Sequence, residues 1–355
     1  MTLTVLIIVA VTQFVFAVVL ALFLFVHRAG AEHRAREEAR GVAALALPMR
    51  RWLMEEGSLD DVCAVLDGLP PVAARAAALR LGRDTLNLEA RATLAEALRG
   101  RPWLHSAFAR ASSLWWWRRL EAARLIADFG TAAQEGTVRR LLHDPHPAVR
   151  IAAANCLRRI ANPALIEIVL NDLPRQPLVV RSAQLSLLCT QWQLAREALL
   201  ARLTPHAPAM ALPHWINVAE AIETPDVLAK TVPLHTHTSA PVRITVARAM
   251  KKYFHADGLR VLLVLIDDPD WRVRAQAARS LGVLRAVEAV PALARHLGDE
   301  TWWMRFRSAL ALAQIGPAGR AALKAARTSP DQFAAQMAAM VSGLSEGSIV
   351  ELVEG

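Results

Sequence analysis

The sequence predicts an all-α protein: a right-handed α-solenoid of stacked antiparallel helix pairs, preceded by one transmembrane helix. Three observations support this prediction. Nearly the same phrase occurs twice, as DPDWRVRAQAARSLGVL at 268–284 and DETWWMRFRSALALAQI at 299–315. Apolar residues recur at helical spacing, and long strand-like alternation is missing. Residues 1–26 carry no charged side chain.

The period set by this phrase extends well beyond the pair. Each copy is marked by an apolar residue or tryptophan followed by arginine, and the markers are Trp117, Val149, Val180, Val242, Val273 and Met304. Successive markers are separated by 32, 31, 62, 31 and 31 positions, which leaves one degenerate unit between Val180 and Val242. A fixed period of roughly 20–50 residues is the signature of a solenoid.

Each unit reads as two helices. Around one turn, Val138, Leu141 and Leu142 form a short apolar stripe, and a longer stripe runs from Val149 to Ile160. The intervening HDPHP at 143–147 ends one helix and starts the next, because Asp and Pro favour such boundaries. A single pair cannot bury its apolar face, whereas stacked pairs share a continuous core.

The strings DPHPAVRIAAANCL at 144–157 and DPDWRVRAQAARSL at 268–281, with a weaker copy at 299–312, resemble HEAT repeats. They are most similar to the short bacterial units called PBS-lyase-like HEAT repeats. The resemblance covers about 112–315. We assign the solenoid to 48–315, and whether its first part, 48–111, holds decayed repeats stays open.

The resemblance also implies a polar ladder, in which an aspartate before the second helix of one repeat meets an arginine of a neighbouring repeat. The matching residues are Asp144, Arg150, Arg181, Arg243, Asp268, Arg274, Asp299 and Arg305, with Arg118 in the first unit. Ser112, Arg175 and His237 stand at the aspartate position elsewhere, so we expect a ladder with gaps.

The N-terminus predicts a membrane anchor over residues 1–27. Residues 3–26 are uncharged, and a helix of 24 residues spans about 36 Å, enough for the hydrocarbon core. Basic residues follow this segment and none precedes it, which predicts a cytoplasmic C-terminal domain on a bacterial inner membrane. Residues 28–47 are charge-dense and predict a juxtamembrane stalk. Residues 316–355 predict a helical cap, with helices near 319–327 and 330–343, and a tail.

A cleaved secretory signal is the alternative to the anchor, since Ala29–Ala31 offers a small-residue cleavage site. The chain would then be a periplasmic solenoid. The missing basic n-region and an apolar run longer than the usual 7–15 residues favour the anchor. Three widely spaced cysteines, Cys63, Cys156 and Cys189, form no disulfide framework and fit buried free thiols.

Five tryptophans fall at one recurrent place, the start of the second helix: Trp115, Trp116, Trp271, Trp302 and Trp303. Tryptophan and arginine are enriched in interface hot spots. We therefore hypothesise that these tryptophans, with Arg305 and Arg307, form a partner-binding surface. The alternative is that the rings fill seams between repeats.

Other chemistry finds little support. The net charge of +9 comes from basic residues spread along the chain, so a nucleic acid partner is not expected. The loop histidines of 143–146 and 235–237 lack nearby cysteines or paired carboxylates, and we expect neither metal nor cofactor. No His-Glu dipeptide occurs, so the iron site of deoxyhypusine hydroxylase, a HEAT-like enzyme, is not expected. No nucleophile, phosphate-loop or zinc motif is present.

The sequence thus predicts a non-enzymatic scaffold that positions a protein partner at the membrane. The partner is expected to be membrane-associated, for example an enzyme or transporter of the cell envelope, with residues 3–26 in the lipid bilayer. No small-molecule substrate is identified. An enzyme of the lyase-like HEAT group is the alternative from another class.

Overall fold

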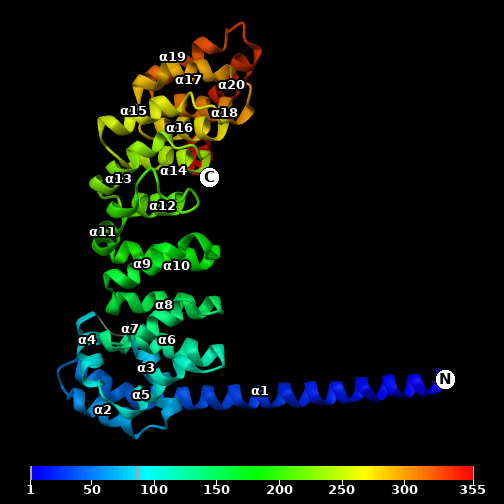
Figure 1. Ribbon diagram of the computed structural model, residues 1–355, viewed down its shortest axis with the longest axis vertical. Helices are drawn as coiled ribbons and strands as arrows, with labels where there is room; N and C mark the ends of the chain where they lie inside the picture. The colour runs from blue at the N-terminus through cyan, green and yellow to red at the C-terminus, as the bar shows by residue number, and fades with distance from the viewer. Residues whose placement is uncertain (1, 85–87, 355) are drawn as a thin grey trace. The chain divides into compact units, whose positions relative to one another are not determined.

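The computed structural model describes residues 2–84 and 88–354, which form helices and contain no strand (Figure 1). The all-α prediction is therefore confirmed for these residues. By compactness the chain divides into two units, Met1–Ile160 and Ala161–Gly355. Each unit is built from helices packed in pairs, as an α-solenoid requires.

The first unit contains eight α-helices among its described residues. They are α1 (Thr2–Leu53), α2 (Leu59–Gly68), α3 (Pro71–Asp84), α4 (Leu88–Ala97), α5 (Pro102–Ala109), α6 (Trp116–Phe129), α7 (Glu135–Leu142) and α8 (Pro147–Ile160). Helices α1, α3, α6 and α8 form one layer, in which α1 packs on α3, α3 on α6, and α6 on α8. Leu66, Leu94, Leu98 and Leu125 are fully buried in its core.

The second unit continues the same construction. Its described α-helices are α9 (Pro163–Asp172), α10 (Leu178–Thr190), α11 (Trp192–Arg202), α12 (Leu212–Ile222), α13 (Pro225–Thr231), α14 (Ala240–Ala249), α15 (Ala256–Leu265), α16 (Trp271–Val283), α17 (Val290–Arg295), α18 (Trp302–Ile315), α19 (Pro317–Ala326), α20 (Gln332–Ser342) and α21 (Glu346–Glu354). Short 3-10 turns join several of them. Helices α10, α12, α14, α16 and α18 form the layer of second helices.

The second helices of the repeats begin at a fixed interval. Helices α6, α8, α10, α14, α16 and α18 keep the predicted period from start to start, with one double interval that contains α12. The first of these starts at Trp116, so the marker residue of its repeat is Arg118 and not Trp117, as the sequence analysis had it. The register predicted for this repeat was therefore wrong by one residue.

Small residues let neighbouring second helices approach closely. Alanine stands five residues after the marker residue in five repeats, and all five are buried: Ala123, Ala154, Ala247, Ala278 and Ala309. The Ser280 hydroxyl donates to the carbonyl oxygen of Ala247 at 2.7 Å, and a Cβ added to Gly282 would lie 2.8 Å from the Cα of Ala311. A larger side chain at either place would separate the helices.

Helix α1 runs without a break through both predicted boundaries, 27/28 and 47/48. From Glu37 onward it packs into the first unit: Leu45 and Met49 are buried, and a Cβ on Gly41 would lie 2.8 Å from the Ala73 carbonyl oxygen. The prediction of a separate stalk over 28–47 needs correction, because its second half belongs to the core. The part before Glu37 carries an ion pair between Arg36 and Glu32.

The segment predicted to span a membrane, 3–26, lies within α1, and the side chains of residues 3–12, 23, 24 and 26 lie outside those that the structure describes. Of the others, Phe14, Phe16, Leu22 and Phe25 are each more than 60% exposed. Among the described residues, none of the helices combines the length and the apolar character that crossing a membrane requires.

The C-terminal residues cover the last repeat. Helices α19 and α20, close to the predicted 319–327 and 330–343, pack against α18 and bury Leu323, Met337 and Val341. The predicted tail is in fact partly helical, because α21 follows and contacts α18.

Candidate protein-interaction surface

Forked arginine–aspartate pairs join successive turns of the second unit. Arg274 donates from Nε and Nη2 to the two carboxylate oxygens of Asp299, each at 3.1 Å. Its Nη1 donates to the carbonyl oxygens of Asp268 and Pro269, at 2.9 and 3.2 Å. One guanidinium thus binds the turn of its own repeat and the carboxylate of the next repeat, in the bidentate geometry that suits arginine.

Two further pairs repeat this geometry. Arg243 donates to Asp268 at 2.7 and 2.8 Å and to the carbonyl oxygens of His237 and Thr238. In the first unit the arginine is Arg119, which donates to Asp144 at 2.6 and 2.9 Å. Arg118, the residue expected there, is exposed. The three pairs are called the Arg–Asp ladder below.

Each ladder carboxylate also accepts a backbone N–H from its own turn. Thr301 donates to Asp299 at 2.8 Å, Asp270 to Asp268 at 2.9 Å, and His146 to Asp144 at 2.9 Å. Burial raises the pKa of Asp299 and of Asp144, but the hydrogen bonds from the backbone and the arginines outweigh it and lower the pKa overall. Both carboxylates are therefore held in the charged form.

Three predicted ladder arginines bind no aspartate carboxylate in the described structure. Arg150 donates to the Asp144 and Pro145 carbonyl oxygens, and its buried Nε has no hydrogen-bond partner among the described residues. Arg181 lies 3.2 Å from Nδ1 of His214. Arg305 lies over the ring of Phe333, 4.6 Å from the centroid. The sequence explains the gaps, because the aspartate positions that would face these arginines hold Arg175, His206 and Pro330.

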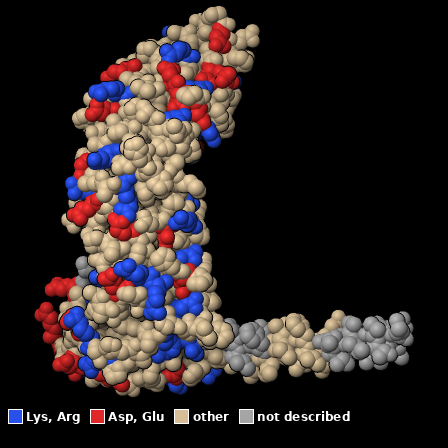
Figure 2. Space-filling model, in the orientation of Figure 1, with Lys and Arg blue, Asp and Glu red and all other residues tan. Residues whose placement is uncertain are grey.

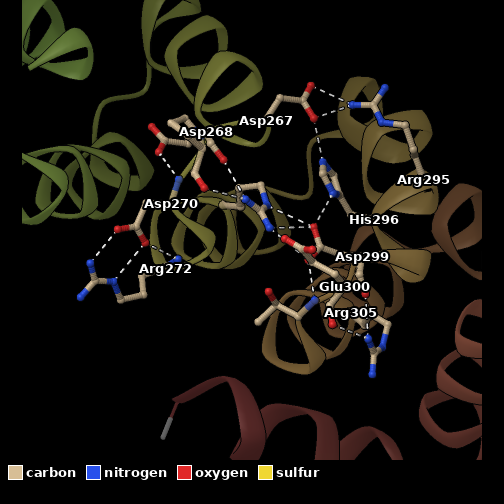
Figure 3. Close-up of polar contacts among 12 residues, drawn as sticks. Asp267, Asp268, Asp270, Arg272, Arg295, His296, Asp299, Glu300 and Arg305 are labelled. Atoms are coloured by element: carbon tan, nitrogen blue, oxygen red, sulfur yellow. Dashed lines mark hydrogen bonds and ion pairs between the residues drawn. The ribbon is translucent and has the colours of Figure 1, made fainter. Parts of the chain in front are cut away.

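A histidine extends the ladder in the second unit. Nδ1 of His296 lies 3.2 Å from Asp299, and its Nε2 lies 2.7 Å from Asp267, which also binds Arg295 (Figure 3). Only a doubly protonated imidazole can donate at both nitrogens. This cluster was not predicted from the sequence, where its one local signal is the three-residue spacing from His296 to Asp299.

The five predicted tryptophans all lie at helix starts and are all exposed. Trp115 is the N-cap of α6 and Trp116 its first residue, Trp271 begins α16, and Trp302 and Trp303 begin α18. Between 39% and 53% of each residue is exposed. By contrast, Trp103 and Trp215 are buried, at 8% and 6%.

Several of the exposed rings rest on the protein on one side. Trp116 stacks on His146 with centroids 3.9 Å apart, and Trp115 stacks on Trp117 at 4.7 Å. In the second unit Trp302 stacks on Phe306 at 4.9 Å, and Trp303 meets Trp302 edge-on. These contacts fix the rings and leave their other side to solvent, which is the arrangement of a preorganised binding surface.

The two arginines assigned to this surface are placed differently from the tryptophans. Arg305 is 9% exposed and donates to the carbonyl oxygens of Asp299 and Glu300, so it stabilises the turn and is not part of the exposed surface. Arg307 is half-buried and donates to the carbonyl oxygen of Leu352 in α21 at 3.1 Å. The hypothesis must therefore be corrected for Arg305.

The loop histidines serve the backbone. Nδ1 of His146 accepts the Ala148 N–H, and Nδ1 of His237 accepts the Ser239 N–H, each at a helix start. Nδ1 of His143 and of His235 each lies within hydrogen-bond distance of a backbone carbonyl oxygen. Within the described residues, no group of three His, Cys, Asp or Glu side chains could hold a metal ion.

A shallow cavity of about 550 Å³ lies in the first unit beside Trp103. Its polar side chains satisfy one another, since Asp67 pairs with Arg101 and accepts the Trp103 indole N–H at 3.2 Å. No nucleophile with an adjacent base lines it, so the cavity adds no support for an enzymatic site.

Comparison with known proteins places HEAT repeats in both units. A family model described as HEAT repeats matches residues 102–188 and 259–342. No curated protein matches the sequence.

Three solved structures are among those to which this chain is similar. Human deoxyhypusine hydroxylase in complex with glycerol is 20% identical over 82% of this chain and 98% of its own, with a TM-score of 0.30. Kap95p in complex with RanGDP is 14% identical over 82% of this chain and 51% of its own, with a TM-score of 0.44. The complex of CpcE and CpcF of phycocyanin lyase from Nostoc sp. PCC7120 is 17% identical over 77% of this chain and 93% of its own, with a TM-score of 0.27.

These low scores carry no argument about function. Two segments of this α-solenoid thus match HEAT repeats, an architecture that suggests a protein-interaction scaffold.

Proposed function

We propose that this protein is a membrane-anchored scaffold that binds a protein partner and holds it at the cytoplasmic face of a bacterial inner membrane. The observation that carries the proposal is the set of five exposed tryptophans at the starts of α6, α16 and α18. Rigid aromatic rings exposed to solvent are the side chains that dominate interface energetics. The work of the protein is binding and not catalysis.

The ladder supports this role because it fixes the turns from which the tryptophans project. Asp268 and Asp299 lie three residues before Trp271 and Trp302, and each accepts a hydrogen bond from its own turn and a fork from the preceding repeat. The rings are thus held in place before a partner arrives. Preorganisation of this kind raises affinity by lowering the entropy lost on binding.

The N-terminal part of α1 supports the anchor. Described apolar side chains from Phe14 to Phe25 are exposed to solvent. A row of exposed phenylalanines and leucines of this length calls for an apolar environment. Figure 2 shows basic side chains, all of them arginines, gathered on the first unit near the base of α1, where anionic headgroups would lie.

The mechanism is recruitment. A scaffold fixed to the bilayer raises the effective concentration of its partner at the membrane without any new contact. A membrane enzyme or transporter of the cell envelope is the class of partner that would benefit most, because both molecules would then diffuse in one plane.

Purification of the tagged full-length protein from its own host in mild detergent, followed by mass spectrometry, tests the proposal. We expect a stoichiometric membrane protein that is lost from the Trp302→Ala/Trp303→Ala variant. Trp192→Ala is the matched control, because Trp192 is 45% exposed and begins α11 but lies outside the set. Recovery of the protein alone, carrying a chromophore or a metal, would favour an enzyme instead. A mature N-terminus at Glu32 would contradict the anchor.

A further inference from the structure

The last helix of the chain, α21, packs against α18, the helix that begins with Trp302 and Trp303. Helix α21 is capped at its start by Ser345, whose hydroxyl accepts the Ser348 N–H at 3.1 Å. Near its end, the Leu352 carbonyl oxygen accepts a hydrogen bond from Nη1 of Arg307 on α18, at 3.1 Å. Helix α21 contacts α18 directly.

The contact at Arg307 is of a kind that recognises a helix end. The last four carbonyl groups of a helix have no partner within it, and the helix dipole places partial negative charge there. Arg307 supplies both a donor and a positive charge at this end. Burial lowers the pKa of Arg307, and the positive charge of Arg279 on α16 lowers this pKa further.

The charges of α21 and of Arg307 are complementary. Residues 344–355 contain Glu346, Glu351 and Glu354 and no basic residue. The recognition involves main-chain groups and general charge, so a helix of another sequence can make the same contact. Trp303 lies one helical turn before Arg307 on the same side of α18 and is exposed, so it is available beside an incoming helix.

Helix α21 is held loosely. None of its described side chains is buried, Ile349 is partly covered, and Val350 remains 54% exposed. A helix of nine residues is only marginally stable in water without tertiary contacts. Few contacts therefore need to break for α21 to leave α18.

We propose that the face of α18 around Trp303 and Arg307 is a receptor for the C-terminal end of a short acidic amphipathic helix. Helix α21 occupies this receptor within the chain, and an acidic helix of the protein partner displaces it. The inference rests on the proposed function, since it names the kind of partner element that the scaffold binds.

The test measures binding of a fluorescent peptide of residues 344–355 to the purified full-length protein by anisotropy. In the wild type the attached α21 competes at high effective concentration, so we expect weak binding. Ile349→Pro in the full chain breaks α21, and we expect the peptide to bind at least about tenfold more tightly. Adding Arg307→Ala should reverse this gain by about tenfold, and high salt should weaken binding.

Arg260→Ala in the Ile349→Pro chain is the matched control, because Arg260 is an exposed arginine on α15. It should leave peptide binding unchanged, and circular dichroism should show the same thermal unfolding for all variants. The inference is overturned if the Ile349→Pro variant binds the peptide no better than the wild type, or if adding Arg307→Ala leaves the affinity for the peptide unchanged. Either result leaves the proposed function standing, because capture of the membrane partner through Trp302 and Trp303 is measured separately.

Discussion

Within the second unit, residues 240–315 and residues 163–222 solve the same packing problem differently. In the first stretch, α14, α16 and α18 start at a strict and constant interval, and Arg243 and Arg274 each fork onto the aspartate of the next repeat. In the second stretch, Arg175 and His206 occupy the aspartate position, so no such fork can form. In residues 240–315 the Arg–Asp pair therefore recurs together with the helix pair.

The irregular stretch is joined by contacts that occur once. The indole N–H of Trp215 on α12 donates to the carbonyl oxygen of Leu170 on α9 at 2.9 Å, and both residues are buried. Arg202 on α11 lies over the Trp215 ring and pairs with Glu167 on α9. The comparison teaches that different polar links can join stacked repeats, and that the period does not depend on the Arg–Asp pair, since α8 and α10 keep the interval although Arg150 binds no aspartate carboxylate.

The largest effect is expected where a ladder carboxylate is removed. Asp299→Ala leaves the buried Arg274 fork, the Thr301 N–H and Nδ1 of His296 without this acceptor. Breaking a buried pair from one side costs about 3–5 kcal/mol. Urea unfolding should show a loss of this size, and Asp299→Ala/Arg274→Met should recover part of it. A loss below about 1 kcal/mol would mean that the ladder does not hold the repeats together.

Acid should weaken the same stretch. The folded-state pKa of Asp299 lies below its unfolded value, and Arg272 holds the pKa of Asp270 at about 2. The stability from these groups is present above the unfolded pKa, about 3.9, and is lost as pH falls through the folded pKa. Unfolding free energy should therefore decline from about pH 4 to about pH 2, and less steeply in Asp299→Asn. If the free energy of unfolding fell equally steeply with pH in the wild type and in Asp299→Asn, the loss of stability in acid could not be assigned to Asp299.

The smallest effect on stability is expected in residues 163–222, where the Arg–Asp ladder is interrupted. Arg181 faces only Nδ1 of His214, so Arg181→Ala should change the free energy of unfolding by less than about 1 kcal/mol. Burial and Arg181 both lower the pKa of His214, so removing Arg181 should raise that pKa. Titration of His214 by NMR measures this shift. A fall in its pKa, or a loss of stability as large as that of Asp299→Ala, would erase the contrast between the two stretches.

Much of this fold can be predicted from the sequence because the same helix pair recurs at a fixed interval. The period and the helix pairs follow from strings such as 268–284 and 299–315. The register of the first repeat was misplaced, because WWWRR offers two arginines and only Arg119 reaches Asp144. The available signal was the period itself, which leads from Arg150 back to Arg119.

Other features could not be predicted because they depend on where separate turns meet. His296 bridges Asp267 and Asp299 across two repeats, and no local motif encodes this. Arg305 matches the ladder position but is buried against Phe333, since Pro330 stands where its aspartate would be needed. Helix α21 is too short and too acidic to be distinguished from a tail, and it is held by a main-chain contact from Arg307.

The central claim is that the Arg–Asp ladder carries stability while the exposed tryptophans are free for a partner. The most direct measurement is urea unfolding of Trp302→Ala/Trp303→Ala beside Asp299→Ala. The double variant loses the stacking of Trp302 on Phe306 and the edge-on contacts of Trp303, and both rings are about half exposed, so we predict a loss of at most about 2 kcal/mol with helical content retained. A loss that equals or exceeds that of Asp299→Ala would contradict the claim and make these tryptophans part of the core.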